Sequence, residues 1–441
     1  MQTVTALGVR ALRAAYRAGT LRPLTVVEDV LAHIASRGDD AVWISVTPAE
    51  VLRERAAELE GLDRALPLWG IPVAVKDNID VAGLPTTAAC PDFAYTPTAD
   101  AGSVRRLREA GAIVVGKTNL DQFATGLNGT RSPYGAPESV YGGDLISGGS
   151  SSGSAVAVAA GIVPVALGTD TAGSGRVPAA LNGIVGLKPT RGLVGTSGVV
   201  PACRSLDCVS VFTRDLADAA TVLDVLAGPD PDDPWSRPDA PAAPGLRLAV
   251  PDGLELDPAV EARFAEVVEA AVTRADGFVR CDAAPLREAG DLLYGGPWVA
   301  ERLAHLEDFL AGDGAVLPVT RAVIERGADF SAVDTFRAIY RLQELKAWAT
   351  RLFETADVLL LPTVPTTFTR AQLTEDPVGR NLVLGRYTQF TNLLDLAAVA
   401  VPAGFTADGR PCGVTLFGPA FSETRLLTAA AALVPTPMEV A

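Results

Sequence analysis

The part of the chain that most constrains its fold is a stretch rich in glycine and serine, residues 141–192. It contains two loops of these residues, 147–154 and 168–176, separated by an apolar segment long enough to be buried. A flexible linker can be rich in glycine and serine, but an apolar segment does not interrupt it. Glycine lets backbone N–H groups approach a ligand and serine supplies hydroxyl groups, so the loops are candidate parts of a site. A pair of structural turns without chemistry is the alternative.

The apolar residues between the two loops predict a helix followed by a strand. Residues 155–160 are good helix formers, and Gly161 is suited to end the helix. Residues 162–167 predict a buried strand in spite of Pro164. The order loop, helix, strand, loop would bring the two glycine-rich loops together at one edge of a sheet.

Short strands separated by helices continue along the rest of the chain, which indicates a layered α/β domain. The predicted helices are residues 4–18, 25–35, 48–62, 101–111, 213–226, 258–275, 288–309 and 332–355. The further predicted strands are residues 71–75, 112–115, 246–250 and 358–362, and residues 388–401 and 413–417 complete the predicted core. Thr25 and Glu28 predict a capping box in the second helix. Residues 229–244, rich in proline and aspartate, predict a surface connector rather than a domain boundary.

The composition excludes several classes of protein. A hydrophobic fraction of 48% over 441 residues fits a globular protein with a sizeable core. The net charge of −15 repels phosphate backbones, so we expect no nucleic-acid partner. Since no apolar run reaches the length of a membrane span, we expect no membrane partner either. The five cysteines are scattered and never form a CxxC pair, which predicts a reducing, cytoplasmic location and no zinc site.

Lysine is scarce in this chain, so its positions are informative. The 37 lysines and arginines include four lysines, and histidine occurs twice. A buried lysine can lose its proton and act as a base, whereas arginine cannot. Lys76 follows the apolar residues 71–75, and partial desolvation there would lower its pKa. A buried ion pair with a carboxylate such as Asp77 is the alternative role of Lys76.

Two short motifs suggest chemistry that their surroundings do not support. Residues 111–118 match the phosphate-loop pattern GxxxxGK[ST], but the four central residues indicate a strand, so we discount nucleotide binding. Residues 149–153 match the GxSxG nucleophile elbow, which requires a histidine further along the chain. His305 is the one histidine that follows, and it falls in a predicted helix, so the sequence does not favour this interpretation.

Two longer segments indicate a family. Residues 148–179, GGSSSGSAVAVAAGIVPVALGTDTAGSGRVPA, closely resemble the signature of the amidase signature family, and residues 71–87, IPVAVKDNIDVAGLPTT, resemble its lysine segment. The separation of 24 residues between Ser150 and Ser174 also matches the family's serine spacing. The resemblance covers most of the chain. It implies an α/β amidase signature fold, with a mixed central β-sheet that helices cover on both faces, and it implies no cofactor and no metal.

The resemblance also implies a catalytic triad. Ser174 would be the nucleophile, Ser150, preceded by a cis peptide bond, would relay its proton, and Lys76 would accept the proton as a neutral base. A hydroxyl bridge of this kind lets a distant amine activate the nucleophile without touching it. A glycine-containing turn also offers backbone N–H groups to an oxyanion. These are the N–H groups of Thr171, Ala172, Gly173 and Ser174.

Within the family, three segments resemble the allophanate hydrolases: residues 119–135, 199–212 and 293–302. In those enzymes a tyrosine and an arginine of the third segment hold the substrate, and they correspond to Tyr294 and Arg302. Eight residues span about two helical turns, so both side chains can face one pocket. Arginine offers a bidentate fork that fits the carboxylate of allophanate. An ordinary salt bridge with a neighbouring glutamate is the alternative role of the arginine.

The resemblance implies hydrolysis of allophanate, a small molecule, to ammonia and N-carboxycarbamate. The alternatives are another amidase, a glutamine amidotransferase subunit with partner subunits, and a silent binding protein of the same fold. We expect a single amidase domain over residues 1–441, with N-terminal helices in 1–65, a catalytic core in 66–228 and 355–441, and a helix-rich substrate-pocket region in 245–355. We do not expect the second, C-terminal domain that allophanate hydrolases commonly carry. Either the sequence is a piece of a longer protein or a separate protein performs the second step, and a homodimer is compatible with both.

Overall fold

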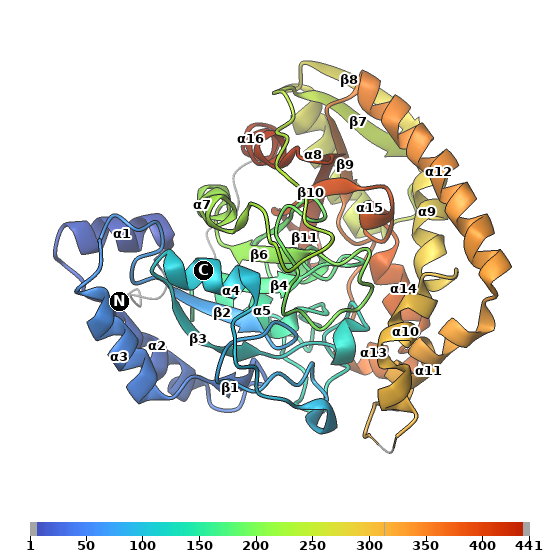
Figure 1. The fold of residues 1–441 in the computed structure, drawn as a ribbon. Helices are drawn as coiled ribbons and strands as arrows, with labels where there is room; N and C mark the ends of the chain where they lie inside the picture. Colours follow the sequence, from blue (N-terminus) through green and yellow to red (C-terminus); the bar gives the residue numbers. More distant parts are fainter. Residues whose placement is uncertain (1–6, 313, 435–441) are drawn as a thin grey trace.

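Eleven strands form one mixed sheet within the part of the chain that the structure describes, residues 7–312 and 314–434 (Figure 1). The structure is a computed structural model. Across the sheet the strands follow the order β1-β3-β2-β4-β6-β5-β10-β11-β9-β7-β8. The strands are β1 Trp43–Val46, β2 Pro72–Lys76, β3 Ile113–Thr118, β4 Val165–Thr169, β5 Val185–Lys188, β6 Val209–Thr213, β7 Arg247–Asp252, β8 Gly277–Asp282, β9 Val358–Pro362, β10 Leu396–Phe405 and β11 Pro411–Pro419.

Side-chain caps mark the start of several helices: the Asp215 carboxylate caps α7, and Ser331 with Asp334 forms a capping box on α12. The α-helices are α1 Val9–Arg17, α2 Pro23–Arg37, α3 Ala49–Leu59, α4 Gly102–Glu109, α5 Ser152–Ala159, α6 Val177–Leu181, α7 Leu216–Leu226, α8 Pro258–Val272, α9 Ala284–Tyr294, α10 Val299–Leu310, α11 Pro318–Glu325, α12 Ala332–Thr355, α13 Arg370–Glu375, α14 Gly379–Gly385, α15 Phe390–Leu393 and α16 Glu423–Leu433. The described residues also form the short 3₁₀ helices η2 Pro91–Phe93, η3 Gln122–Ala124 and η4 Arg326–Asp329. No helix of the described residues combines the length and the apolar character that crossing a membrane requires.

The sheet combines parallel and antiparallel pairs. Strand β2 is parallel to β3 and β4, and β7 is parallel to β8 and β9, whereas the pairs that join β4 to β9 across the middle of the sheet are antiparallel. Because β2 and β4 are parallel neighbours, their carboxyl ends lie at the same edge of the sheet. The residue that ends β2 and the loop that follows β4 are therefore brought together there.

Helices cover both faces of this sheet. Successive residues of a strand point to opposite faces, and in β9 the side chains of Val358 and Leu360 enter one core while those of Leu359 and Leu361 enter another. Helices α7, α8 and α16 pack in the first core, and α9, α12 and α15 pack in the second. The predicted fold class, a mixed sheet with helices on both faces, is confirmed.

The predicted helix over residues 288–309 is wrong, because the chain forms two helices there, α9 and α10. Gly295, Gly296 and Pro297 separate them. Glycine has a low helix propensity, and proline removes a backbone donor from a helix interior. A Cβ atom on Gly296 would also lie 2.5 Å from the Leu292 carbonyl oxygen, so no side chain fits at that position.

The predicted capping box of Thr25 and Glu28 is also wrong. Helix α2 begins at Pro23, its N-cap residue Arg22 makes no side-chain cap, and Thr25 lies inside the helix. Proline is favoured in the first helical turn, where the missing N–H would have no partner anyway. Glu28 pairs with Arg53 instead, at 2.7 Å.

Other element boundaries differ from the predictions, whereas the end of α5 agrees with its prediction. Strand β4 begins immediately after Pro164 and continues to Thr169, because the proline cannot donate to a neighbouring strand. Helix α5 ends before Gly161, which has φ +72°, as predicted. Helix α7 begins only after β6 has ended at Thr213. The first helix is shorter than predicted, and residues 4–6 of that prediction lie outside the described residues.

Candidate active site

Lys76 lies at the carboxyl end of β2 and is fully buried. Its Nζ donates to Ser150 Oγ at 2.8 Å and to Thr169 Oγ1 at 2.8 Å. Thr169 ends β4, the parallel neighbour of β2, so the pairing of these strands fixes the position of Thr169 relative to Lys76. Burial lowers the pKa of Lys76 to about 7, although nearby carboxylates act in the opposite direction. Much of this amine is therefore neutral near pH 7.

The ion pair that was the alternative role of Lys76 belongs to a different lysine. Asp77 Oδ1 lies 3.1 Å from Lys117 Nζ, and both side chains are fully buried. Lys117 also donates to Thr86 Oγ1 at 2.9 Å. Lys117 is the lysine of the phosphate-loop match, and it lies inside strand β3. This ion pair with Asp77 inside a strand agrees with the prediction that the motif does not bind a nucleotide.

The peptide bond between Gly149 and Ser150 is cis, as the resemblance implied. Gly149 occupies a place where no side chain fits, since a Cβ atom would lie 2.2 Å from Asp121 Oδ2 and 2.6 Å from Gly129 N. The two glycine-rich loops meet, because Ser151 Oγ donates to the carbonyl oxygen of Thr169 at 3.2 Å. The absence of a side chain at Gly149 thus lets the first loop pack closely enough to place Ser150 beside Lys76.

Ser174 lies on the turn between β4 and α6, and a buried ion pair holds this turn. The Asp170 carboxylate accepts from Arg176 Nε and Nη2, both at 2.9 Å, and both side chains are fully buried. The same carboxylate accepts from the backbone N–H groups of Gly173 at 2.8 Å and Gly175 at 3.0 Å. Within residues 7–312 and 314–434 the Ser174 hydroxyl forms no hydrogen bond. The hydrogen-bonded part of the implied relay therefore links the lysine to Ser150.

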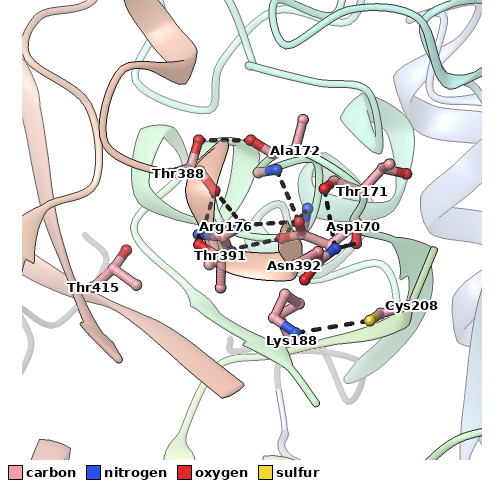
Figure 2. Close-up of polar contacts among 12 residues, drawn as sticks. Asp170, Thr171, Ala172, Arg176, Lys188, Cys208, Thr388, Thr391, Asn392 and Thr415 are labelled. Carbon is pink, nitrogen blue, oxygen red and sulfur yellow. Dashed lines mark hydrogen bonds and ion pairs between the residues drawn. The ribbon is translucent and has the colours of Figure 1, made fainter. Parts of the chain in front are cut away.

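Two residues far along the chain hold the carbonyl groups of the same turn (Figure 2). Asn392 Nδ2 donates to the carbonyl oxygens of Asp170 at 2.7 Å and Thr171 at 3.0 Å. Thr388 Oγ1 donates to the carbonyl oxygen of Ala172 at 2.7 Å. With its carbonyl groups occupied by these partners, the turn keeps a fixed backbone conformation.

One of the four predicted oxyanion donors is already occupied. The Gly173 N–H donates to the side chain of Asp170, three residues earlier in the same turn. It is therefore not available to an oxyanion and leaves the predicted set of donors. Among the described residues, the backbone N–H groups of Thr171, Ala172 and Ser174 donate to no other group. These three N–H groups are free to bind a developing negative charge.

Tyr294 and Arg302 lie on two different helices rather than on two turns of one helix. Tyr294 ends α9, and Arg302 lies near the start of α10. The break between the helices nevertheless brings the side chains together: Arg302 Nη2 donates to Tyr294 Oη at 3.1 Å, and Arg302 Cζ lies 5.2 Å from the ring centroid. Both residues are buried. The predicted proximity is confirmed, but the helical spacing offered as its reason is wrong.

Arg302 forms no salt bridge with an acidic side chain among the described residues. The alternative role, an ion pair with a neighbouring glutamate, is therefore wrong. Its Nη1 donates to Thr125 Oγ1 at 2.9 Å and to the Ala124 carbonyl oxygen at 3.4 Å. Its Nε is buried without a hydrogen-bond partner. Its positive charge adds, after burial, to the lowering of the Lys76 pKa. A buried guanidinium of this kind favours an anionic ligand.

The sequence reasoning missed the residues that hold the Ser174 turn. One signal was present, since Asp170 and Arg176 stand six residues apart inside a loop of small residues. Charged residues are seldom buried unless they are paired, so a predicted buried loop with one acid and one base indicates an ion pair. Thr388 and Asn392 gave no comparable signal, because only the folded chain brings them to the turn.

Replacing Asp170 with asparagine is expected to destabilise the protein by about 3–5 kcal/mol, because Arg176 would remain buried without a counter-charge. The measurement is the free energy of unfolding in urea. Asp252→Asn is the matched control, since its ion pair with Arg280 is exposed, and its loss should cost less than about 1 kcal/mol. Similar small losses in both variants would contradict the structural role of the buried pair.

The described residues contain no group of three or more histidine, cysteine, aspartate or glutamate side chains arranged to hold a metal ion.

The serine–histidine interpretation also gains no support from the geometry. Ser151, the serine of the GxSxG match, donates to a backbone carbonyl, and His305 lies on α10.

Comparison with known proteins identifies the family of the chain. The model of the Amidase family matches residues 25–427, and the chain belongs to this family. Urea amidolyase of Saccharomyces cerevisiae is 48% identical over 404 residues, which are 88% of this chain and 22% of that protein, so the chain spans less than a quarter of that relative. The structure of SeMet-substituted Kluyveromyces lactis allophanate hydrolase matches with a TM-score of 0.92 and 41% identity, over 98% of this chain and 74% of that one. A glutamyl-tRNA(Gln) amidotransferase subunit of Symbiobacterium thermophilum is 37% identical over 468 residues, 96% of this chain and 95% of that protein.

Proposed function

We propose that this protein hydrolyses the terminal amide of allophanate and releases ammonia and N-carboxycarbamate. The class of reaction, hydrolysis of a linear amide C–N bond, follows from the family. One observation carries the choice of substrate: the buried Arg302, beside Tyr294, has an N–H group without a partner and no acidic partner among the described residues. The carboxylate of allophanate would complete this arrangement. A relative of 41% identity, the Kluyveromyces lactis enzyme, bears the name allophanate hydrolase, which supports the assignment.

In the proposed mechanism, Ser174 Oγ attacks the amide carbon and passes its proton to Ser150, which passes its own proton to neutral Lys76. The free N–H groups of the turn, those of Thr171, Ala172 and Ser174, would stabilise the oxyanion. The proton on Lys76 then returns through Ser150 to the terminal amide nitrogen of the substrate, and ammonia leaves. A water molecule activated through the same two residues then cleaves the acyl-enzyme and regenerates the serine.

Electrostatics supports a separate cation for the carboxylate of the substrate. The protein carries a net charge of −15, which opposes the approach of a small anion at long range. Lys76 is not available as the local cation, since the mechanism needs it neutral and since it acts at the scissile amide. Arg302 keeps its charge at every working pH, and the Tyr294 hydroxyl adds a second donor.

Replacing Arg302 with alanine is expected to lower kcat/KM for allophanate by ~2–4 kcal/mol, or about 30- to 1,000-fold, because a charge-assisted contact to a buried ligand is lost. Slow turnover of a neutral amide such as acetamide should hardly change, because acetamide has no carboxylate to hold. The measurement is ammonia release from both substrates by the wild type and the variant.

Arg302→Lys is the matched variant for this test, since it keeps the charge and loses the fork. We expect it to retain part of the activity on allophanate. Equal losses on allophanate and acetamide in Arg302→Ala would mean that the arginine supports the fold alone. The allophanate assignment would then lose its main physical support, while the amidase chemistry would stand.

A role in a glutamine amidotransferase is the rival function, and the full-length similarity to one component of such an enzyme favours testing it. Glutamine also carries a carboxylate, so it belongs beside allophanate in the same assay. Ammonia release from glutamine at a higher kcat/KM than from allophanate would replace the proposed function with the rival one.

A further inference from the structure

The loop of residues 121–131 lies between the serine relay and the arginine that would hold the substrate. It belongs to the first of the three segments that resemble the allophanate hydrolases. The Asp121 N–H donates to the Ser150 carbonyl oxygen at 3.0 Å. Four residues further on, Thr125 Oγ1 accepts a hydrogen bond from Arg302 Nη1 at 2.9 Å. One short loop therefore contacts both the relay and the proposed carboxylate-binding group.

Hydrogen bonds within the loop fix its shape. The Asp121 carboxylate accepts from three backbone N–H groups of the loop. They are those of Asn128 at 3.2 Å, Gly129 at 3.1 Å and Arg131 at 2.9 Å. Phe123 and Ala124 have φ of +51° and +52°, in the left-handed region that residues with a side chain seldom adopt. Such conformations persist where the surrounding contacts over-determine them, so the loop holds the next residue, Thr125, in a defined position.

The Thr125 hydroxyl faces Arg302 as an acceptor. Thr125 is buried, and its Oγ1 also donates to the Phe123 carbonyl oxygen at 3.1 Å. A hydroxyl has one proton to donate and two lone pairs that accept. Because the proton is directed at Phe123, the lone pairs remain for Arg302, which can only donate.

A second buried guanidinium holds the backbone of Thr125. Arg131 Nη1 donates to the Thr125 carbonyl oxygen at 2.9 Å, and Arg131 Nη2 donates to the Pro377 carbonyl oxygen. Burial lowers the pKa of Arg131, and the positive charge of Arg302 acts in the same direction, whereas Asp121 opposes it. Thr125 thus lies between two buried cations and offers a separate oxygen atom to each.

The bond to Thr125 also affects the donors of Arg302 that are left for a ligand. A guanidinium carries five N–H donors in one rigid plane. Nη1 donates to Thr125 and to the Ala124 carbonyl oxygen, and Nη2 donates to Tyr294. Nε has no hydrogen-bond partner in the part of the chain that the structure describes. Because the group is planar, a contact that fixes Nη1 also fixes the direction of the Nε–H bond.

We propose that Thr125 is a positioning residue, whose hydroxyl holds the Arg302 guanidinium in the orientation that binds the carboxylate of the substrate. This inference rests on the proposed function, because it assigns Thr125 a role in the same pocket. Without the hydroxyl, Nη1 would keep only the longer contact with the Ala124 carbonyl oxygen, 3.4 Å, and the guanidinium could turn. A misdirected fork binds a carboxylate less well, whereas a substrate without a carboxylate is not affected.

Replacing Thr125 with valine tests this role, because valine keeps the shape of the side chain and lacks the hydroxyl. We expect kcat/KM for allophanate to fall about tenfold, mainly through KM, because the hydroxyl accepts a charge-assisted hydrogen bond that orients a binding group. Turnover of acetamide should hardly change. Thr125→Ser restores the hydroxyl and should lie within about threefold of the wild type on allophanate.

Thr47→Val is the matched control. Thr47 is buried beside the edge strand β1, and its Oγ1 donates to the Val114 carbonyl oxygen at 3.0 Å. This variant also loses one buried hydrogen bond, but it should leave kcat/KM for both substrates unchanged. The free energy of unfolding is measured for every variant. Thr125→Ala, which lacks the hydroxyl and cannot overfill the site, takes the place of the valine variant if that variant does not fold.

A double-mutant cycle separates positioning from a general structural role. In the Arg302→Ala background, Thr125→Val should lower kcat/KM for allophanate by less than about twofold, because Thr125 acts through the arginine. A threonine that supports the fold alone would cause the same loss in both backgrounds.

Equal losses on allophanate and acetamide in Thr125→Val would overturn the inference. Wild-type activity in that variant, no recovery in Thr125→Ser, or an undiminished effect in the Arg302→Ala background would overturn it as well. Arg302→Ala distinguishes this failure from that of the proposed function. A selective loss in Arg302→Ala without an effect of Thr125→Val removes the role of Thr125 alone. An unselective loss in Arg302→Ala removes the allophanate assignment and, with it, the role of Thr125.

Discussion

Ser174→Ala is expected to lower kcat/KM for amide hydrolysis by on the order of 10⁴-fold or more, because the proposed mechanism has no other nucleophile. The folded structure should persist, since the Ser174 hydroxyl makes no hydrogen bond within the described residues and its loss leaves no partner unsatisfied. The measurements are ammonia release and the free energy of unfolding, together with labelling by a fluorophosphonate and mass analysis of the labelled peptide.

Ser152→Ala is the matched control for this variant. Ser152 is the first residue of α5, and within the described residues its hydroxyl makes a single long hydrogen bond, 3.4 Å to the Asn119 carbonyl oxygen. This control should keep most of its activity. Persistent activity in Ser174→Ala, or a fluorophosphonate label on a different serine, would contradict the assignment of the nucleophile.

Lys76→Arg is expected to lower kcat/KM by about 10²–10⁴-fold, the usual contribution of a general base, because a guanidinium does not release its proton at any working pH. Arginine keeps a long side chain with N–H donors, but it stays charged where the mechanism needs a neutral amine, so a loss of activity reports the missing base. The larger guanidinium also enters a fully buried site, and the free energy of unfolding shows whether the chain tolerates it.

The pH profile of the wild type provides the second measurement for this residue. Burial lowers the pKa of Lys76 to about 7, and the proposed mechanism needs the neutral amine. Activity should therefore rise as the pH passes upward through about 7 and fall below it, where the amine is protonated. Near wild-type activity in Lys76→Arg with the same profile would place the base elsewhere.

The candidate site residues could be proposed from the sequence because each lies in a short segment with its own pattern, and the family resemblance supplied their roles. Lys76 ends a short apolar strand, and Ser150 and Ser174 lie in the two glycine-rich loops. Scarcity also helped, since a chain with four lysines and two histidines offers few candidates for a base. The mixed sheet with helices on both faces followed from the same segments and the family resemblance.

The contact between Tyr294 and Arg302 was predicted, but the structure gives a different reason for it. Spacing along one helix placed Tyr294 beside Arg302, whereas the observed contact depends on a break at Gly295, Gly296 and Pro297 that turns the chain between two helices. The break was visible in the sequence, since these residues disfavour a helix interior. The direction of the chain after the break was not, because packing against the rest of the protein sets it.

The sequence by itself determined which residues carry the candidate chemistry, because residue type and short-range spacing fix functional groups and local conformation. The tertiary structure alone decided which of these groups are free to act. Asp170 occupies the N–H of Gly173, Lys117 takes the ion pair with Asp77, and the neighbouring Lys76 is left in a buried site with a lowered pKa. Hydrogen-bond partners and burial depend on segments that are far apart in the sequence and meet only in the folded chain, so no local pattern contains them.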